Sequence, residues 1–309
     1  MSRGLIIISG ATGFIGKALT RELAESGYDI AVLTRDREKA KAQFRDRAII
    51  AEWDGQTSQG WLELASCARA LINLAGENIG AGRWTKKRKK LIVGSRLNAG
   101  RAVVDAVRRA PAKPKTVIQA SAVGYYGPRE HEPLDESATA GEGFLADTVR
   151  QWELSTQEVE DAGVRRVVIR SGLVLGKDGG VLPRFLRPFR LFLGGPLGTG
   201  RQWFSWVHWK DEVGAIRFLL EREDLHGVFN VASPQSLTMR EFAKTLGRVI
   251  KRPSWFPVPA FLPRLIFGEM AKETLLAGQK VLPDALLKAG YIFQYPEIEA
   301  ALKDILSAD

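Results

Sequence analysis

The chain has a single cysteine, Cys67, and only three histidines among its 309 residues. One cysteine cannot form an internal disulfide, which is typical of a protein in a reducing compartment. The histidines and the cysteine are widely spaced, so we expect no metal site. No run approaches the roughly 20 apolar residues of a membrane helix, and Leu5 to Ser9 is too short for the apolar region of a secretory signal. We therefore expect a cytoplasmic protein with no membrane partner.

Charge of one sign is in excess: the formal net charge is +10. Much of it comes from Arg83 and the run 86–90, which reads KKRKK. Such a run can bind nucleic acid or an acidic surface. We favour a solvated helix face beside a site for a phosphate-rich ligand, because no nucleic-acid-binding motif accompanies the run. The sequence therefore predicts no nucleic-acid partner.

The first half of the chain alternates apolar runs with helical patterns. Gly4–Ser9 is a continuous apolar run, typical of a strand buried on both faces of a sheet. Further strands are expected at Asp29–Thr34, Ala48–Trp53, Ala70–Ala75, Thr116–Ala120 and Arg166–Arg170, with helices between most of them, notably over 86–109 and 144–162. This alternation predicts an α/β fold, a doubly wound parallel sheet of the Rossmann type.

The character of the sequence changes after Gly176. Prolines and glycines interrupt residues 177–203, and most of the chain after residue 233 has helical patterns. Between them, Val228–Ala232 is a short apolar run that can rejoin the sheet. We predict a Rossmann domain of residues 1–176 plus about 204–233. A smaller, mostly helical substrate domain would comprise about 177–203 and 234–309.

A glycine-rich motif follows the first strand and opens the first helix: Gly10, Gly13 and Gly16 lie within GATGFIG. Glycines permit a tight turn and close approach of the backbone to a pyrophosphate, and the helix N-terminus offers unpaired N–H groups to the anion. The preceding strand and following helix supply the context that this motif requires. We predict a dinucleotide site that also includes Thr12, Phe14 and Ile15.

The end of the second strand indicates which dinucleotide is bound. An NAD site usually has an acidic residue there for the ribose hydroxyls, whereas this chain has Thr34 and Arg35, with Asp36 one position further. A guanidinium can bind a 2′-phosphate that a carboxylate would repel. We therefore predict NADP(H). Asp54 is expected near the adenine, and the adenosine–pyrophosphate side is expected to be lined by Leu74, Ala75 and Gly76.

Several longer motifs resemble those of extended short-chain dehydrogenases/reductases: GATGFIG (10–16), INLAGENI (72–79), SAVGYYG (121–127), RSGLVLG (170–176) and FSWVHWKDE (204–212). More narrowly, the chain is similar to an atypical, epimerase-like subgroup with a C-terminal domain of undefined function, here Gly268 through Pro283. The resemblance implies a Rossmann fold and NADP(H) binding, and it implies no particular substrate.

The resemblance also bears on catalysis. In the wider family the tyrosine of a Tyr-x-x-x-Lys pair exchanges a proton with the substrate, the lysine lowers the pKa of that tyrosine, and a serine steadies the reacting oxygen. Ser121 matches the serine, but Leu145 and Val149 occupy the tyrosine and lysine positions. The candidate replacement proton donor is Tyr125, or Tyr126 beside it. Arg96 is expected to hold a cofactor phosphate or a substrate anion, with a structural ion pair as the alternative.

Two functions remain open on these residues. The first is an NADP(H)-dependent oxidoreductase or epimerase-type enzyme acting on a small polar or anionic substrate. The second is a non-catalytic NADP(H)-binding regulator or scaffold. A proton donor beside the nicotinamide would favour the first, and a filled pocket there would favour the second.

Overall fold

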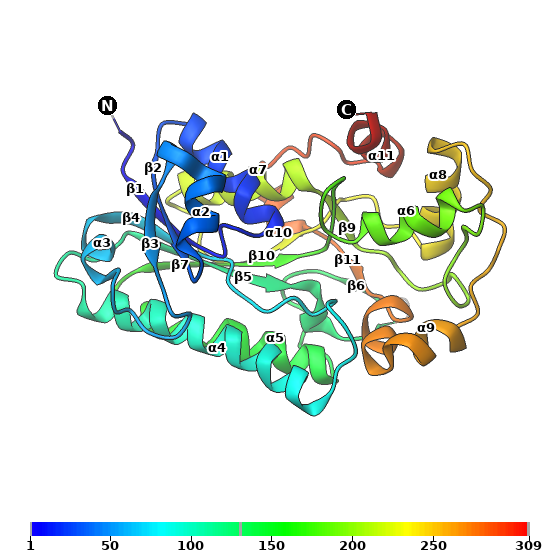
Figure 1. The fold of residues 1–309 in the computed structure, drawn as a ribbon, viewed down its shortest axis with the longest axis horizontal. Coiled ribbons are helices and arrows are strands. Elements are labelled where there is room, and N and C mark those ends of the chain that lie inside the picture. The colour runs from blue at the N-terminus through cyan, green and yellow to red at the C-terminus, as the bar shows by residue number, and fades with distance from the viewer. Residues whose placement is uncertain (1, 130–131, 308–309) are drawn as a thin grey trace.

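The computed structural model describes residues 2–129 and 132–307. Its centre is a sheet of seven parallel strands in the order β10-β7-β5-β4-β1-β2-β3 (Figure 1). The strands are β1 (Leu5–Ser9), β2 (Asp29–Thr34), β3 (Ile49–Glu52), β4 (Ala68–Asn73), β5 (Thr116–Ala122), β7 (Arg165–Ser171) and β10 (Gly227–Val231). The apolar run near residue 230 therefore does rejoin the sheet, at its edge beside β7.

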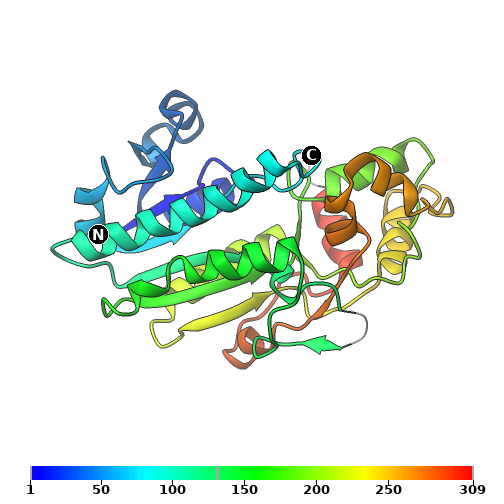
Figure 2. The ribbon, with the colours of Figure 1, turned by 90° about the horizontal axis from the view of Figure 1, so that it is seen from below.

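Helices cover both faces of this sheet. One face carries α1 (Phe14–Glu25), α2 (Arg37–Phe44) and α7 (Trp209–Glu221), and the other carries α3 (Leu62–Cys67), α4 (Lys86–Arg109) and α5 (Phe144–Leu154). Figure 2 shows α4 and α5 lying side by side across the second face. The core on the first face includes Ile8, Leu19 and Ile216, and that on the second includes Leu71 and Val103. The predicted doubly wound α/β fold is confirmed.

The helix expected over 144–162 is shorter than the sequence pattern indicates. It ends at Leu154 and is followed by the 3₁₀ turn η3 (Gln157–Val159). The hydroxyl of Ser155 donates a hydrogen bond to the backbone O of Trp152. Ser155 also packs so closely on Gly100 of α4 that a Cβ at Gly100 would lie 1.9 Å from its Oγ. Local side-chain bonding of this kind competes with helix continuation.

The second half of the chain builds a smaller core at the carboxyl end of the sheet. The helices that form this core are α6 (Leu182–Arg190), α8 (Met239–Val249) and α11 (Ile298–Ser307). The same half of the chain also has α9 (Phe261–Phe267) and the short α10 (Asp284–Lys288), whose Leu286 packs into the core on the first face of the large sheet. Phe204 and Phe242 stack at 4.2 Å in the smaller core, with Phe189 and Leu302 also buried there. The proposed division of the chain into two domains stays a prediction.

Two small parallel ribbons connect this region to the large sheet. One pairs β8 (Leu173–Leu175) with β9 (Trp206–His208), and the other pairs β6 (Pro133–Leu134) with β11 (Lys280–Val281). Among residues 2–129 and 132–307, no helix has the length and apolar content needed to cross a membrane. The same residues contain no group of three or more metal-ligating side chains.

Candidate functional site

The glycine motif forms a tight turn between β1 and α1 that only glycine can build. Gly10 has φ +73°, and a Cβ there would lie 2.7 Å from the carbonyl carbon and oxygen of Leu74. A Cβ on Gly16 would lie 2.3 Å from the backbone O of Gly10. These contacts bring β1, the turn and the start of α1 closer together than any side chain would allow.

A cavity of about 370 Å³ lies over this turn. It is lined by Gly10, Gly13, Phe14, Ile15, Gly16 and Leu74, together with Gly172, Leu173, Val174, Gly180 and Val181. Gly13 is the N-cap of α1, and the helix has neither a side-chain cap nor an acidic residue in its first turn. The N–H groups of that turn are therefore available to an anion. The backbone geometry and the uncapped N–H groups of the first turn of α1 fit a dinucleotide pyrophosphate.

The second wall of the cavity was missed by the sequence prediction. Residues 172–174 follow β7, and 180–181 precede α6, far along the chain from the glycine motif. The ring of Phe14 packs into this wall, since a Cβ on Gly176 or Gly179 would lie 2.2 or 2.3 Å from the ring. RSGLVLG marked the segment as a family motif, but no spacing rule placed it against Phe14.

Arg35 projects from the end of β2 into solvent and forms no ion pair or hydrogen bond with the described residues. Its neighbours hold its backbone in place: the backbone N of Asp36 donates to the hydroxyl of Thr34 at 3.1 Å. The Asp36 carboxylate accepts the N–H of Lys39 at 3.0 Å and so caps α2. The Asp36 carboxylate is therefore occupied as the N-cap of α2, and the Arg35 guanidinium remains free to bind a ligand.

Asp54 also has local partners. Its carboxylate accepts hydrogen bonds from the backbone N–H groups of Gln56 and Thr57, at 2.7 and 2.9 Å, in the loop after β3. Arg35 lies near this loop, with its Cδ 3.8 Å from where a Cβ of Gly55 would be. The loop thus approaches Arg35, while the Asp54 carboxylate itself closes a turn; its expected place near the adenine stays a prediction.

Arg96 of α4 binds the segment that follows β4. Its Nη1 donates to the backbone O of Glu77 at 3.0 Å and to that of Ile92 at 3.1 Å. The guanidinium lies 4.6 Å from the ring centroid of Trp152, and burial lowers its pKa to about 10. Its contacts place it against Gly76, where a Cβ would be 3.1 Å from Cζ.

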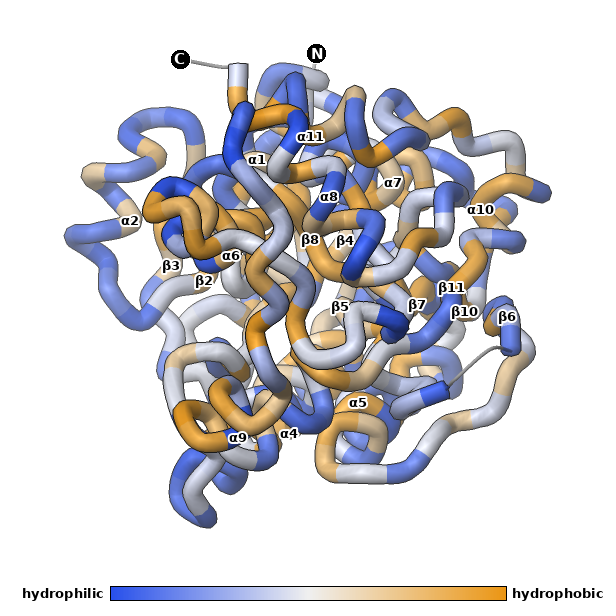
Figure 3. Tube along the Cα trace, turned by 90° about the vertical axis from the view of Figure 1, so that its right-hand side faces the viewer, coloured by the Kyte–Doolittle hydropathy of each residue, from blue (hydrophilic) through white to orange (hydrophobic). Residues whose placement is uncertain are grey.

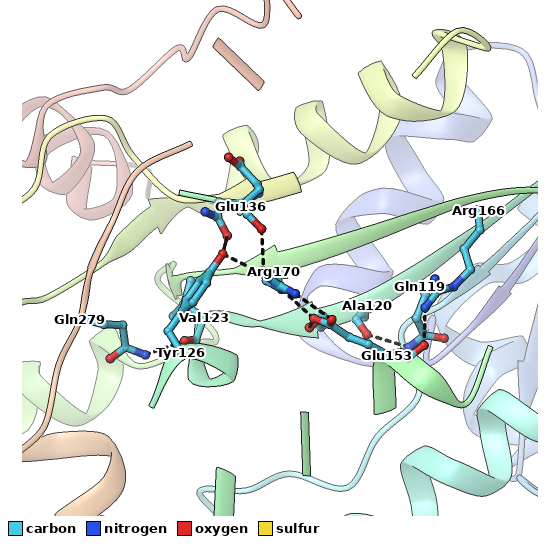
Figure 4. A network of polar contacts seen from close by, with 11 residues as sticks. Gln119, Ala120, Val123, Tyr126, Glu136, Glu153, Arg166, Arg170 and Gln279 are labelled. Atoms are coloured by element: carbon cyan, nitrogen blue, oxygen red, sulfur yellow. Dashed lines mark hydrogen bonds and ion pairs between the residues drawn. The ribbon is translucent and has the colours of Figure 1, made fainter. Parts of the chain in front are cut away.

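Ser121 belongs to a buried polar network at the carboxyl ends of β5 and β7. Figure 4 shows Glu153, Arg170 and Tyr126 of this network. The Ser121 hydroxyl donates to the Glu153 carboxylate of α5. That carboxylate forms a two-point ion pair with Arg170, at 2.8 and 2.9 Å. Burial alone would lower the pKa of Arg170, but its bonds to Glu153 raise it. Neither Glu153 nor Arg170 is among the site residues predicted from the sequence.

The two tyrosines after β5 have different surroundings. Tyr126 is fully buried, donates its hydroxyl to Asn230 at 2.7 Å and accepts from Arg170 at 3.0 Å. Burial raises the pKa of Tyr126. Tyr125 is partly exposed, and the Arg170 guanidinium lies 3.4 Å from its ring centroid. Tyr125 is therefore the tyrosine with access to a ligand, and neither it nor Ser121 lines the glycine-loop cavity.

Leu145 and Val149 pack on the turn that carries Tyr125 and Tyr126. Both lie 3.8 Å from where a Cβ of Gly124 would be, and Val149 is buried. Leu145 joins an apolar cluster with Trp84, Ile92 and Met270. An apolar surface thus occupies the positions at which the wider family has its tyrosine and lysine.

A buried carboxyl group lies behind the cavity wall. Glu212 of α7 is 2% exposed and accepts a hydrogen bond from the hydroxyl of Ser171, the residue before Gly172. Burial raises the pKa of Glu212 to about 7. Its Oε2 has no hydrogen-bond partner among the described residues.

The C-terminal segment reaches back over the turn that carries the tyrosines. Glu273, in the π-helical turn η4 (Ala271–Leu275), accepts the backbone N–H groups of Phe144 and Leu145 at 3.2 and 2.8 Å. The Gln279 amide donates to the backbone O of Val123 at 2.7 Å. Residues from the end of the chain therefore fix both α5 and the turn η2 (Val123–Tyr126).

The doubly wound fold and the glycine turn are typical of a class of nucleotide-binding proteins. The comparison with known protein families points to the same class. Residues 6–232 match the NAD dependent epimerase/dehydratase family, and residues 258–305 match a domain of unknown function, DUF1731. The chain belongs to this epimerase/dehydratase family, with the C-terminal domain that the sequence motifs indicated. The resemblance predicted from the sequence is confirmed.

Among its relatives, the epimerase family protein YfhF of Bacillus subtilis is 38% identical over 303 residues, covering 98% of both chains. The human epimerase family protein SDR39U1 is 38% identical over 305 residues, covering 98% of this chain and 99% of the human one. A crystal structure of human SDR39U1 (isoform 2) with NADPH superposes with a TM-score of 0.87 at 36% identity, over 99% of this chain and 100% of that one. The UDP-glucose 4-epimerase of Thermus thermophilus, at 18% identity and a TM-score of 0.77, shares the fold.

Proposed function

We propose that the chain binds NADP(H) at the glycine turn and acts as an oxidoreductase or epimerase-type enzyme on a small polar or anionic substrate. The observation that carries the proposal is the cavity over the first turn of α1, with Gly13 as an uncapped N-cap. The free Arg35 at the end of β2 supports NADP(H) over NAD(H). The structure of human SDR39U1 with NADPH gives a precedent in a relative.

Each part of the site would have a defined task. The α1 N-terminus would bind the pyrophosphate and Arg35 the 2′-phosphate, while residues 172–174 and 180–181 would enclose the nicotinamide half. The bound cofactor would supply hydride transfer. Tyr125 would hold the proton that moves with the hydride, at its Oη, because Leu145 and Val149 cannot titrate. Ser121 would orient the reacting oxygen through the hydroxyl that Glu153 now accepts.

A second candidate function is a non-catalytic NADP(H)-binding regulator or scaffold. It is favoured by the apolar packing of Leu145 and Val149 against Gly124, and by the engagement of the Ser121 hydroxyl with Glu153. Both candidates share the cofactor and differ in whether hydride reaches a substrate. A cytoplasmic setting suits the single cysteine in either case.

Binding of NADPH can be tested by titration with Gly13→Ala. Gly13 lines the cavity with φ −77°. Among the described residues other than its chain neighbours, the one heavy atom within 4 Å of an added Cβ is the backbone O of Gly10, at 3.2 Å. The methyl group should therefore intrude on the anion site and leave the fold intact. We expect wild-type protein to bind NADPH and Gly13→Ala to bind at least tenfold more weakly, with unchanged urea unfolding. No NADPH binding by the wild type would refute the proposal.

A further inference from the structure

Large apolar side chains are exposed together on the C-terminal half of the molecule. They come from the loop after α6, from the segment that leads into α9 and from α9 itself. The side chains that are more than half exposed are Leu191, Phe192, Leu193, Trp255, Phe256, Phe261, Leu265 and Ile266. Trp255 is 80% exposed, which is unusual for a tryptophan of a globular protein. We call this group, with the cations described below, the apolar–basic patch. In Figure 3 orange segments lie on α9 and beside α6.

The two segments that form the patch run side by side. The backbone N of Phe256 donates to the O of Gly194 at 3.2 Å. The N–H of Gly198 donates to the O of Val258 at 2.8 Å. Farther along, the Arg252 guanidinium lies 4.6 Å from the Phe192 ring centroid. The exposed apolar groups of these two segments therefore form one connected surface, and those of α9 follow it directly along the chain. Such a surface is of the kind that marks an interaction site.

The charge of the patch has one sign. Residues 179–203 and 250–268 contain no aspartate or glutamate. Exposed cations border the apolar groups: Arg187, Arg190, Lys251, Arg252 and Arg264. Among the described residues none of these five cations forms an ion pair. The unpaired cations are therefore available to an anionic partner.

We propose that the apolar–basic patch docks the protein on an anionic lipid surface. Cations beside exposed leucine, phenylalanine and tryptophan are the combination that binds the headgroup region of anionic bilayers. Tryptophan is favoured at that depth. The proposal goes beyond the cofactor site and does not depend on it. It also departs from the sequence-based expectation of no membrane partner, which rested on the lack of a spanning segment.

Two other occupants fit the patch less well. A second copy docked through the same face would oppose five cations to the same five, because a two-fold interface pairs each patch with itself. Single-stranded nucleic acid stacks on aromatic rings, whereas half of the exposed apolar groups are aliphatic, including Leu191, Leu193, Leu265 and Ile266. Leucine and isoleucine side chains enter lipid favourably but have no ring face on which a base can stack.

Co-sedimentation with vesicles tests the proposal. The probes are vesicles of phosphatidylcholine alone and of phosphatidylcholine with phosphatidylglycerol. We expect the wild-type protein to bind the anionic vesicles and not the neutral ones, with binding weakened by salt. Binding should shift Trp255 emission to the blue, and this shift should disappear in Trp255→Phe. Equal binding to both vesicle types, or to neither, would overturn the proposal.

Two sets of variants locate the contact. The apolar set is Phe192→Gly, Leu265→Ser and Ile266→Ser; glycine suits position 192 because its φ is +62°. The cationic set is Arg187→Gln and Arg190→Gln. We expect each set to weaken vesicle binding on the order of tenfold or more, while NADPH affinity is unchanged. Matched controls are Ile292→Ser, at an 85% exposed residue outside the patch, and Arg101→Gln on α4.

Loss of vesicle binding in the controls to the same extent as in the patch variants would show nonspecific attraction and overturn the proposal. Sedimentation velocity without lipid provides the second readout. A wild-type dimer that the apolar set dissociates, with no vesicle binding, would assign the patch to a second copy. Tighter binding to a single-stranded oligonucleotide than to anionic vesicles would assign it to nucleic acid.

Discussion

The carboxylate of Glu273 accepts the backbone N–H of Leu145 at 2.8 Å, so a residue of the C-terminal domain caps α5. It also accepts the N–H of Phe144, and α5 has no cap of its own because Gly143 is the N-cap residue. Leu145 occupies the position at which the wider family has its tyrosine. The C-terminal segment therefore stabilises the helix on which the wider family has its tyrosine and lysine.

Removing this cap should destabilise the protein. We expect Glu273→Ala to lower the free energy of unfolding by about 1–2 kcal/mol, the usual cost of a lost N-cap, and Glu273→Gln to lower it less, because the amide oxygen still accepts. Urea denaturation followed by circular dichroism measures both. Glu269→Ala is the control, since its ion pair with Lys89 is partly exposed and should contribute less than about 1 kcal/mol. Equal losses for Glu273→Ala and Glu269→Ala would show that the cap contributes little.

Glu212 should make stability depend on pH. Burial raises its pKa from 4.5 to about 7 in the folded chain. The protonated form therefore stabilises the native state fully below pH 4.5, and this contribution is lost as pH rises through about 7. The total is about 3 kcal/mol, since one pKa unit corresponds to ~1.4 kcal/mol. Glu212→Gln should remove the loss between pH 5 and 8, measured as the difference from wild type in urea titrations. A difference that does not vary with pH would contradict this assignment.

Neutralising the basic run should leave cofactor binding nearly unchanged. Lys89 pairs with Glu269 and lies 4.7 Å from the Phe144 ring, and no lysine of the run lines the glycine-loop cavity. We expect the triple variant Lys86→Gln, Lys87→Gln and Lys89→Gln to bind NADPH within a few-fold of wild type. Duplex DNA should bind weakly to both proteins, in the nonspecific range. Sub-micromolar, salt-dependent DNA binding by the wild type would show that the run is a nucleic-acid site.

Generic carbonyl substrates should react slowly. With Leu145 and Val149 packed on Gly124, no side chain there can carry the proton that accompanies hydride. We expect negligible NADPH oxidation across a panel of ketones and sugar nucleotides. Any substrate that does react should lose most of its turnover in Ser121→Ala and in Tyr125→Phe, while both variants keep wild-type NADPH affinity. Turnover that survives both substitutions would exclude the proposed proton pathway. No measurable NADPH oxidation with any substrate of a broad panel would favour the non-catalytic function.

The sequence predicted those parts of the molecule whose structure depends on residues close together in the chain. Alternating strand and helix patterns define the sheet, and the glycine turn needs only residues 10–16 and the strand before them. The lining residues Gly10, Phe14 and Leu74 follow from that local geometry. Even here the polar loops were less predictable, because Asp36 and Asp54 are bound to their own backbone neighbours.

The rest depends on packing between distant segments. Glu153 reaches Ser121 across 32 positions and Arg170 across 17. Glu273 meets α5 across more than 120 positions. One signal was available: Glu153 is a charged residue next to Trp152, on a helix whose other buried residues are mainly apolar. Such a residue is usually paired, but only the fold identifies its partner.

The central claim is that the glycine turn binds NADP(H) and that Arg35 recognises the 2′-phosphate. Titration of wild type, Arg35→Ala and the neighbouring control Arg37→Ala with NADPH and NADH tests it most directly. We predict that wild type prefers NADPH, and that Arg35→Ala weakens NADPH by about 1.5–3 kcal/mol, the scale of a lost charge-assisted hydrogen bond. NADH affinity should stay nearly unchanged, and Arg37→Ala should affect neither cofactor. An equal loss for both cofactors in Arg35→Ala, or no NADPH preference in wild type, would contradict the claim.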